Sequence, residues 1–176
     1  LYLYHSSYSD NGVYTAGAKF SLKDGTMDGV GACTANGEVY DSFAIHENDG
    51  KLRLLTTDWT NDVNGLYLFN EKMEMTGKLE GLARGEQIYA ARYFGDTAYF
   101  VTYRNTDPLF AVDLSDEKNP KVLSELKITG FSEYLHFWGT DKLLGIGYET
   151  DPDTGEQKGI KLTMFDISDP ADLKTI

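Results

Sequence analysis

Three basic side chains occur at matching places in the sequence. His46, Arg92 and His136 each lie six or seven residues before the first apolar residue of a short hydrophobic segment. Imidazole and guanidinium groups donate hydrogen bonds to polar ligands, so equivalent positions on strands around one channel would form a ligand-binding ring. The alternative is structural, with each side chain hydrogen-bonded to the backbone of a neighbouring repeat. We take all three as candidate ligand-binding residues.

An acidic segment near the C-terminal end is the candidate metal site. Asp151, Asp153, Gly155 and Glu156 resemble the start of a calcium-binding loop, in which alternating carboxylates surround a hard cation. The glycine comes too early and the twelve-residue pattern is incomplete, so the alternative is a solvated hairpin tip. We expect no cofactor, and Ca²⁺ is the metal that this segment would suit.

A tryptophan marks the third candidate position. Trp59 lies in a polar segment with Asp58, Asn61, Asp62 and Asn64, which indicates a loop between two strands. An exposed indole ring gives a large contact area at a low cost in conformational entropy, so Trp59 is the binding candidate of this loop. The alternative is that its ring packs against the neighbouring sheet.

The sequence lacks the motifs of the common enzyme classes. It has no Gly-x-Ser-x-Gly motif, no phosphate-binding glycine-rich loop, no His-Glu-x-x-His and no paired cysteines for zinc. His5, His46 and His136 are too dispersed to indicate a metal site, although a triad assembled in space stays open. We therefore name no catalytic residue, and the sequence favours a non-catalytic role over an enzymatic one.

Composition narrows the class of partners. The 176 residues carry a formal net charge of −12, which repels nucleic acid phosphates and anionic lipid head groups. The 12 tyrosines and 18 glycines favour pleated strands and tight turns. No apolar run approaches the roughly 18 residues of a membrane helix. We therefore expect no nucleic acid partner and no direct membrane insertion. The single cysteine, Cys33, is predicted to be a buried structural thiol.

A turn followed by a short apolar strand occurs three times. The turn residues Gly50, Asp96 and Asp141 are separated by 46 and 45 residues, and a period of about 40–50 residues made of short strands is typical of β-propeller blades. An Asp-Leu-Ser-Asp segment at Asp113 recurs as Asp-Ile-Ser-Asp at Asp166, where the Asp and Ser side chains favour a turn. These repeats predict an all-β fold.

A blade is an antiparallel four-stranded meander, and the repeats place its strands along the chain. We expect one domain, a partial β-propeller of about three to four blades, with limits near 1–37, 38–84, 85–130 and 131–176. The first blade lacks its innermost strand, and the second begins with a strand over 42–46. Three to four blades do not close the usual ring, so we expect the fragment to self-associate through its terminal blades.

Several segments, in order along nearly the whole chain, resemble a known family. They are GKLEGLA at 77–83, IYAARY at 88–93, DPLFAVDLS at 107–115, LSELKI at 123–128, YLH at 134–136, GIG at 145–147 and FDISDP at 165–170. The chain resembles the secreted bacterial and archaeal β-propeller family that is distantly related to WD-repeat propellers. This resemblance implies an exported or surface-anchored protein with no assigned activity and no catalytic residues to transfer.

Together these features predict a non-catalytic extracytoplasmic binding or interaction module whose ligand is a protein or a carbohydrate. Two alternatives stay open. One is a fragment of a propeller enzyme, hydrolase-like or lyase-like, that uses channel-facing side chains and Ca²⁺. The other is a structural spacer at the cell surface. Exposed aromatic side chains on one loop face would favour the binding module, whereas convergent ionisable groups with perturbed pKa values would favour the enzyme.

Overall fold

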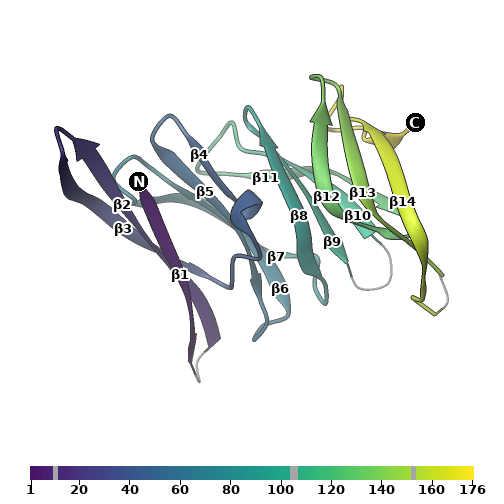
Figure 1. The fold of residues 1–176 in the computed structure, drawn as a ribbon, viewed down its shortest axis with the longest axis horizontal. Helices are drawn as coiled ribbons and strands as arrows, with labels where there is room; N and C mark the ends of the chain where they lie inside the picture. The colour runs from purple at the N-terminus through teal and green to yellow at the C-terminus, as the bar shows by residue number, and fades with distance from the viewer. Residues whose placement is uncertain (10–11, 104–106, 152–153) are drawn as a thin grey trace. The chain divides into compact units, whose positions relative to one another are not determined.

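The computed structural model describes residues 1–9, 12–103, 107–151 and 154–176, and the regular structure in this part of the chain is almost entirely β (Figure 1). The all-β class predicted from the repeats is confirmed. The strands are β1 Tyr2–Ser9, β2 Gly12–Lys23, β3 Thr26–Asn36, β4 Ile45–Asn48, β5 Lys51–Asp58, β6 Val63–Phe69, β7 Met75–Leu82, β8 Gln87–Phe94, β9 Thr97–Tyr103, β10 Asp107–Asp113, β11 Lys121–Ile128, β12 Phe131–Trp138, β13 Lys142–Thr150, β14 Gln157–Asp166 and β15 Lys174–Thr175.

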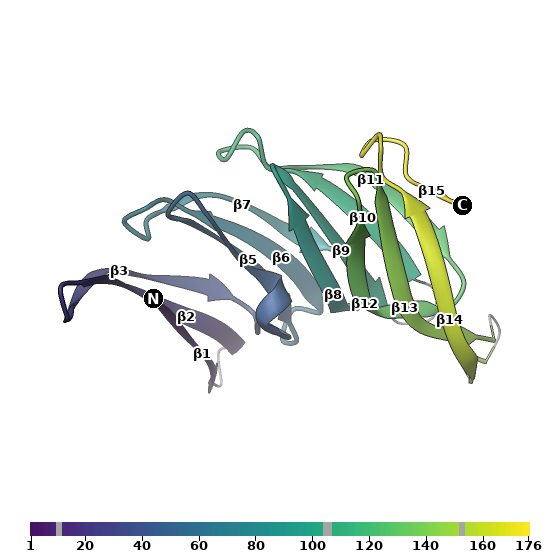
Figure 2. The same ribbon diagram turned by 45° about the horizontal axis from the view of Figure 1, so that its top comes forward.

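Consecutive strands pair antiparallel into four sheets. Sheet 1 has the order β1-β2-β3, sheet 2 β4-β5-β6-β7, sheet 3 β8-β9-β10-β11 and sheet 4 β12-β13-β14-β15. Figure 2 shows β12, β13 and β14 of sheet 4 side by side. Each sheet is therefore the simple meander expected of a blade, and sheet 1 has three strands where the other sheets have four.

The three turns that define the period lie at equivalent places. Gly50, Asp96 and Asp141 follow β4, β8 and β12, which are the first strands of their sheets. The Asp96 carbonyl oxygen accepts a hydrogen bond from the Leu114 N–H at 2.8 Å, and the Asp141 carbonyl oxygen accepts one from Ile167 at 2.8 Å. The three turns thus occupy equivalent places in their sheets, as predicted, and at Asp96 and Asp141 the same backbone hydrogen bond recurs.

The Asp-x-Ser segments form the predicted turns at the ends of β10 and β14. The Asp113 carboxylate accepts a hydrogen bond from the backbone N–H of Ser115 at 2.9 Å, and Asp166 accepts one from Ser168 at 3.0 Å. Hydrogen bonds from these serines hold the pKa of both aspartates below the ordinary value. These aspartates therefore stabilise turns in their ionised form.

The strand predicted over 42–46 is wrong at its start. Ser42–Ala44 forms a 3₁₀ turn, and β4 begins only at Ile45. The Asp41 carboxylate accepts hydrogen bonds from the backbone N–H groups of Phe43 at 2.8 Å and Ala44 at 3.2 Å. A side chain that caps the local backbone in this way favours a turn over an extended conformation.

The chain divides into two compact units, each with two sheets. Unit 1 comprises Leu1–Arg84 with Glu117–Asn119, and unit 2 comprises Gly85–Asp116 with Pro120–Ile176. The strands of each sheet fall within one of the four predicted blade ranges. The assignment of all four blades to a single domain stays a prediction.

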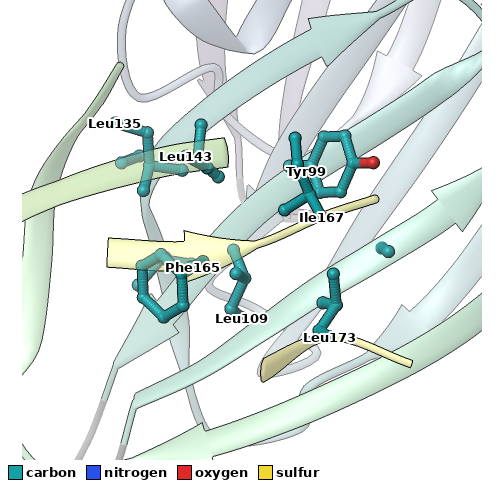
Figure 3. Close-up of a cluster of buried hydrophobic side chains, with 10 residues drawn as sticks. Tyr99, Leu109, Leu135, Leu143, Phe165, Ile167 and Leu173 are labelled. Carbon is teal, nitrogen blue, oxygen red and sulfur yellow. The ribbon is translucent and has the colours of Figure 1, made fainter. Parts of the chain in front are cut away.

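The core of unit 2 is a cluster of apolar side chains drawn from both of its sheets (Figure 3). Phe165 of β14 and Leu135 of β12 are fully buried. Full burial of an apolar side chain of this size is worth about 1.5–3 kcal/mol. The labelled members of the cluster are Tyr99, Leu109, Leu135, Leu143, Phe165, Ile167 and Leu173.

The core of unit 1 joins sheet 1 to sheet 2. Cys33 of β3 packs with Leu54, Tyr67 and Met73 of the second sheet or its loops. Burial raises the pKa of the Cys33 thiol above its ordinary value, so the thiol stays protonated and inert. The prediction of a buried structural cysteine is confirmed.

A recurring close approach in unit 1 brings a strand glycine against a loop carbonyl. A Cβ atom on Gly31 of β3 would overlap the carbonyl oxygen of Lys72 and lie 3.0 Å from its carbonyl carbon. A Cβ atom on Gly77 of β7 would overlap the carbonyl oxygen of Glu117 in the same way. Both strands therefore need a residue without a side chain at these positions.

Apolar side chains are exposed on both the first and the last sheet. Leu3 of β1 is 54% exposed, and Ile160 and Leu162 of β14 are 79% and 66% exposed. Such surfaces are typical of association sites, and self-association through them stays a prediction. Within the described ranges, every helix falls short of the length and hydropathy that a membrane span requires.

Candidate functional site

The three predicted ring residues occupy one register position. His46 in β4, Arg92 in β8 and His136 in β12 each form the third residue pair counted from the turn that follows the strand. These strands are also the edge strands that begin their sheets. The equivalence inferred from spacing therefore holds in the backbone, because the pairing register is repeated along with the turn.

In unit 2, a tyrosine brings two of the ring residues together. The guanidinium carbon of Arg92 lies 4.6 Å from the centre of the Tyr134 ring, a favourable cation–π distance. The Tyr134 hydroxyl group lies 3.3 Å from Nδ1 of His136, and the two rings are nearly parallel, at 17°. The Arg92 guanidinium also donates a hydrogen bond to the Ala91 carbonyl oxygen at 2.6 Å.

Tyr134 is a site residue that sequence reasoning missed. It lies two residues before His136 on β12, and residues two apart on a strand face the same side of the sheet. The strand period could therefore have identified it. Tyr134 and His136 are both exposed while Arg92 is half-buried, so these three side chains form a polar surface that a ligand can reach.

His46 belongs to unit 1 and has different surroundings. It is half-buried and pairs across the hairpin with Arg53, which is only 3% exposed. Burial lowers the pKa of His46, the nearby positive charge of Arg53 lowers it further, and Glu47 acts in the opposite direction. His46 is thus favoured as the neutral imidazole, and a common channel for His46, Arg92 and His136 stays a prediction.

The lowered pKa of His46 predicts a pH-dependent stability. The folded state binds this proton less readily than the unfolded state, whose histidine has the ordinary value of 6.5, so protonation favours unfolding. The contribution to stability is complete above pH 6.5 and is lost as the pH falls toward the lower folded-state value. We expect the melting temperature to decline as the pH falls below 6.5, and His46→Gln should flatten this decline.

The control for this experiment is His136→Gln, at the equivalent register position of an exposed side chain. This variant retains His46 and should keep the slope of the wild-type profile. A profile for His46→Gln as steep as the wild type would show that another group sets the pH dependence.

The acidic segment forms a hydrogen-bonded loop. The Asp151 carboxylate accepts a hydrogen bond from the Thr154 N–H at 3.1 Å and pairs with the Lys158 ammonium group at 2.7 Å, which raises the pKa of Lys158. Asp153 lies outside the described residues. Among the residues that are described, no group of three or more His, Cys, Asp or Glu side chains is arranged to hold a metal ion. Calcium binding by Asp151, Asp153 and Glu156 stays a prediction.

Trp59 is exposed on the loop between β5 and β6. Its side chain is 53% exposed, and its indole N–H donates a hydrogen bond to the Glu38 carboxylate at 3.2 Å. The Asp58 carboxylate holds the loop by accepting hydrogen bonds from the Thr60 N–H at 3.0 Å and from the Asn61 amide at 2.7 Å. The indole ring is therefore both accessible and held in a defined place.

Trp59 forms one wall of a hollow of about 300 Å³, lined by Glu38, Tyr40, Thr57 and Trp59, which we call the Trp59 hollow. Tyr40 is 56% exposed and Glu38 is half-buried. An isolated antiparallel β-bridge joins Glu38 to Thr57. The Glu38 N–H donates to the Thr57 carbonyl oxygen and the Thr57 N–H to the Glu38 carbonyl oxygen, with nitrogen–oxygen distances of 2.8 and 2.9 Å. This bridge brings a segment beyond β3 against the end of β5.

Glu38 also interacts with Tyr8 at the edge of sheet 1. The Tyr8 hydroxyl group donates a hydrogen bond to the Glu38 carboxylate, and this bond and the negative charge of Glu38 raise the pKa of Tyr8. Sequence reasoning identified Trp59 but missed Glu38 and Tyr40. The residues lie some twenty positions apart, and only the Glu38–Thr57 bridge brings them together, so no local pattern indicated the contact.

Comparisons with known proteins agree with the repeat pattern. A family model described as the beta propeller domain matches residues 1–176. An uncharacterized protein of Archaeoglobus fulgidus is 44% identical over 153 residues, which cover 86% of this chain and 23% of that protein. The uncharacterized protein MJ1554 of Methanocaldococcus jannaschii is 43% identical over 161 residues, 89% of this chain and 24% of that protein.

The chain therefore spans about a quarter of the length of these curated relatives. Among solved structures, the C-terminal WD40 domain of Sif2 matches with a TM-score of 0.42 and 9% sequence identity. That match covers 93% of this chain and 51% of the other.

Proposed function

Because this chain belongs to the beta propeller domain family, we propose that it is part of a non-catalytic, extracytoplasmic binding module. The location outside the cytoplasm rests on the likeness of its sequence to secreted propeller domains. Repeats that present loops from a fixed scaffold are well suited to binding. The ligand would be a protein or a carbohydrate.

The observation that supports a binding role best is the Trp59 hollow. Two aromatic side chains that are more than half exposed, Tyr40 and Trp59, flank a half-buried carboxylate. Tryptophan and tyrosine contribute strongly to binding energy because they bury a large area with few rotatable bonds. A structural spacer has no need of such a surface, and an exposed indole has no ordinary catalytic role.

The Arg92, Tyr134 and His136 surface of unit 2 is the second candidate binding position. Its cation and its hydroxyl group offer hydrogen-bond donors, and its rings offer stacking area. We place it second because the stacking of Arg92 on Tyr134 already uses one face of that ring.

Trp59→Ala should weaken ligand binding by roughly thirtyfold, the effect of losing an aromatic hot spot worth about 2 kcal/mol. The measurement is binding of wild-type and variant protein to a panel of immobilised oligosaccharides and peptides. The fold should persist, because Trp59 is exposed and its loop is held by Asp58.

The matched control is Trp138→Ala, since Trp138 is also an exposed tryptophan, 61% accessible, but lies in unit 2. It should retain the binding that Trp59→Ala loses. Equal losses in both variants, or wild-type protein that binds no member of the panel, would contradict the proposal. Unfolding of Trp59→Ala, seen by circular dichroism, would show that the ring serves the fold.

A further inference from the structure

We propose that the Trp59 hollow binds a primary ammonium group, such as the end of an alkylamine or of a lysine side chain. This inference rests on the binding role proposed above and names the chemistry of the ligand. The hollow combines two exposed aromatic rings, Trp59 and Tyr40, with the carboxylate of Glu38. Aromatic faces attract cations through the ring quadrupole, and a carboxylate adds both opposite charge and hydrogen-bond acceptors.

The charge of Glu38 is the first argument. Among the described residues its side chain bonds only to neutral donors, the indole N–H of Trp59 and the hydroxyl group of Tyr8. A carboxylate offers about four lone-pair sites, so acceptor capacity is left for a ligand. A half-buried carboxylate gains more from a bound cation than a fully solvated one does, because its environment screens charge less.

The fixed geometry of the hollow is the second argument. Gly37, at φ +90°, turns the chain so that Glu38 can pair with Thr57, and a Cβ atom there would lie 2.8 Å from the Thr57 carbonyl. The Thr15 hydroxyl group donates a hydrogen bond to the Gly37 carbonyl oxygen at 2.8 Å. The Thr56 hydroxyl group donates one to the Asn36 carbonyl oxygen at 2.6 Å. A wall that is already ordered adds little entropic cost to binding.

The net charge is the third argument. A formal charge of −12 over 176 residues attracts cationic ligands at long range and repels anionic ones. A sugar could stack on Trp59 as well, but it would leave the charge of Glu38 without a counter-ion. We therefore favour the ammonium group over a carbohydrate hydroxyl.

The test uses the fluorescence of Trp59 in a Trp138→Phe background, where it is the only tryptophan. The probe is n-butylammonium, and 1-butanol is its uncharged counterpart. We expect saturable quenching by n-butylammonium that weakens as salt is added, and no saturable response to 1-butanol. Glu38→Gln should weaken binding roughly tenfold, because the amide keeps the size of the side chain but loses its charge.

The matched control is Glu71→Gln, which removes one negative charge from an exposed loop residue of the same unit. It should bind n-butylammonium as the unmodified background does. Absence of saturable binding, or equal affinity in Glu38→Gln, overturns the ammonium assignment. Tighter binding of cellobiose than of n-butylammonium overturns it as well.

These outcomes are distinct from failure of the proposed function. If Trp59→Ala loses binding to a panel ligand while Glu38→Gln retains it, the hollow is a binding site for an uncharged group. The ammonium assignment then fails and the binding role stands. If Trp59→Ala and Glu38→Gln both bind every panel ligand as the wild type does, both proposals fail.

Discussion

Phe165→Ala should lower the free energy of unfolding by about 3–5 kcal/mol, the usual cost of deleting a buried aromatic ring. Phe165 is a fully buried member of the unit 2 core (Figure 3) and pairs with Leu143 across β13 and β14. The other members of its cluster come from β8, β9, β10, β12 and β13 and from the segment after β14, so they cannot all move in to fill the space. The measurement is urea unfolding followed by circular dichroism.

The control is Ile160→Ala on the same strand. Ile160 is 79% exposed, so its truncation removes side-chain atoms without creating a cavity and should change the unfolding free energy by less than about 0.5 kcal/mol. If Phe165→Ala cost no more than Ile160→Ala, the cluster would not be the stabilising core of unit 2.

Gly31→Ala should destabilise the protein by about 1–3 kcal/mol or more, because a methyl group has no space at this position. Its Cβ atom would overlap the Lys72 carbonyl oxygen and lie 3.2 Å from the Cβ atom of Met73. Relief requires a shift of the loop backbone, and Met73 is part of the unit 1 core. Urea unfolding measures this effect as well.

Gly29→Ala, two residues earlier on β3, is the matched control. A Cβ atom at Gly29 would have no neighbour within 4 Å among the described residues. The unfolding free energy should stay unchanged or rise by up to about 1 kcal/mol, because alanine reduces the entropy of the unfolded chain. Equal destabilisation by Gly29→Ala and Gly31→Ala would mean that strand propensity, and not the close approach, is responsible.

Local signals were enough to predict the turns and most strands. The residues around Gly50, Asp96 and Asp141 are small or polar and are followed by apolar runs, so both the turn and its period could be recognised from sequence. The start of β4 was missed for a local reason too, since Asp41 stabilises a 3₁₀ turn where the apolar pattern favoured a strand.

Prediction of the candidate sites from sequence was harder than prediction of the turns and strands, because these sites depend more on contacts between residues that are distant in the chain. The shared register of His46, Arg92 and His136 followed from spacing, and Tyr134 could have been added from the strand period. Glu38 and Trp59 are a different case, because a single bridge between separate elements places them together. A contact of this kind leaves no repeat, period or motif in the chain.

The close approaches at Gly31 and Gly77 indicate which positions of these contacts tolerate substitution. Each glycine meets a main-chain oxygen, and the residues that supply it are a lysine in one case and a glutamate in the other. Because the opposing atom belongs to the main chain, neither contact depends on which side chain the opposing residue carries. The residue that supplies the oxygen can therefore be replaced by another amino acid without loss of the contact, provided that the glycine is kept.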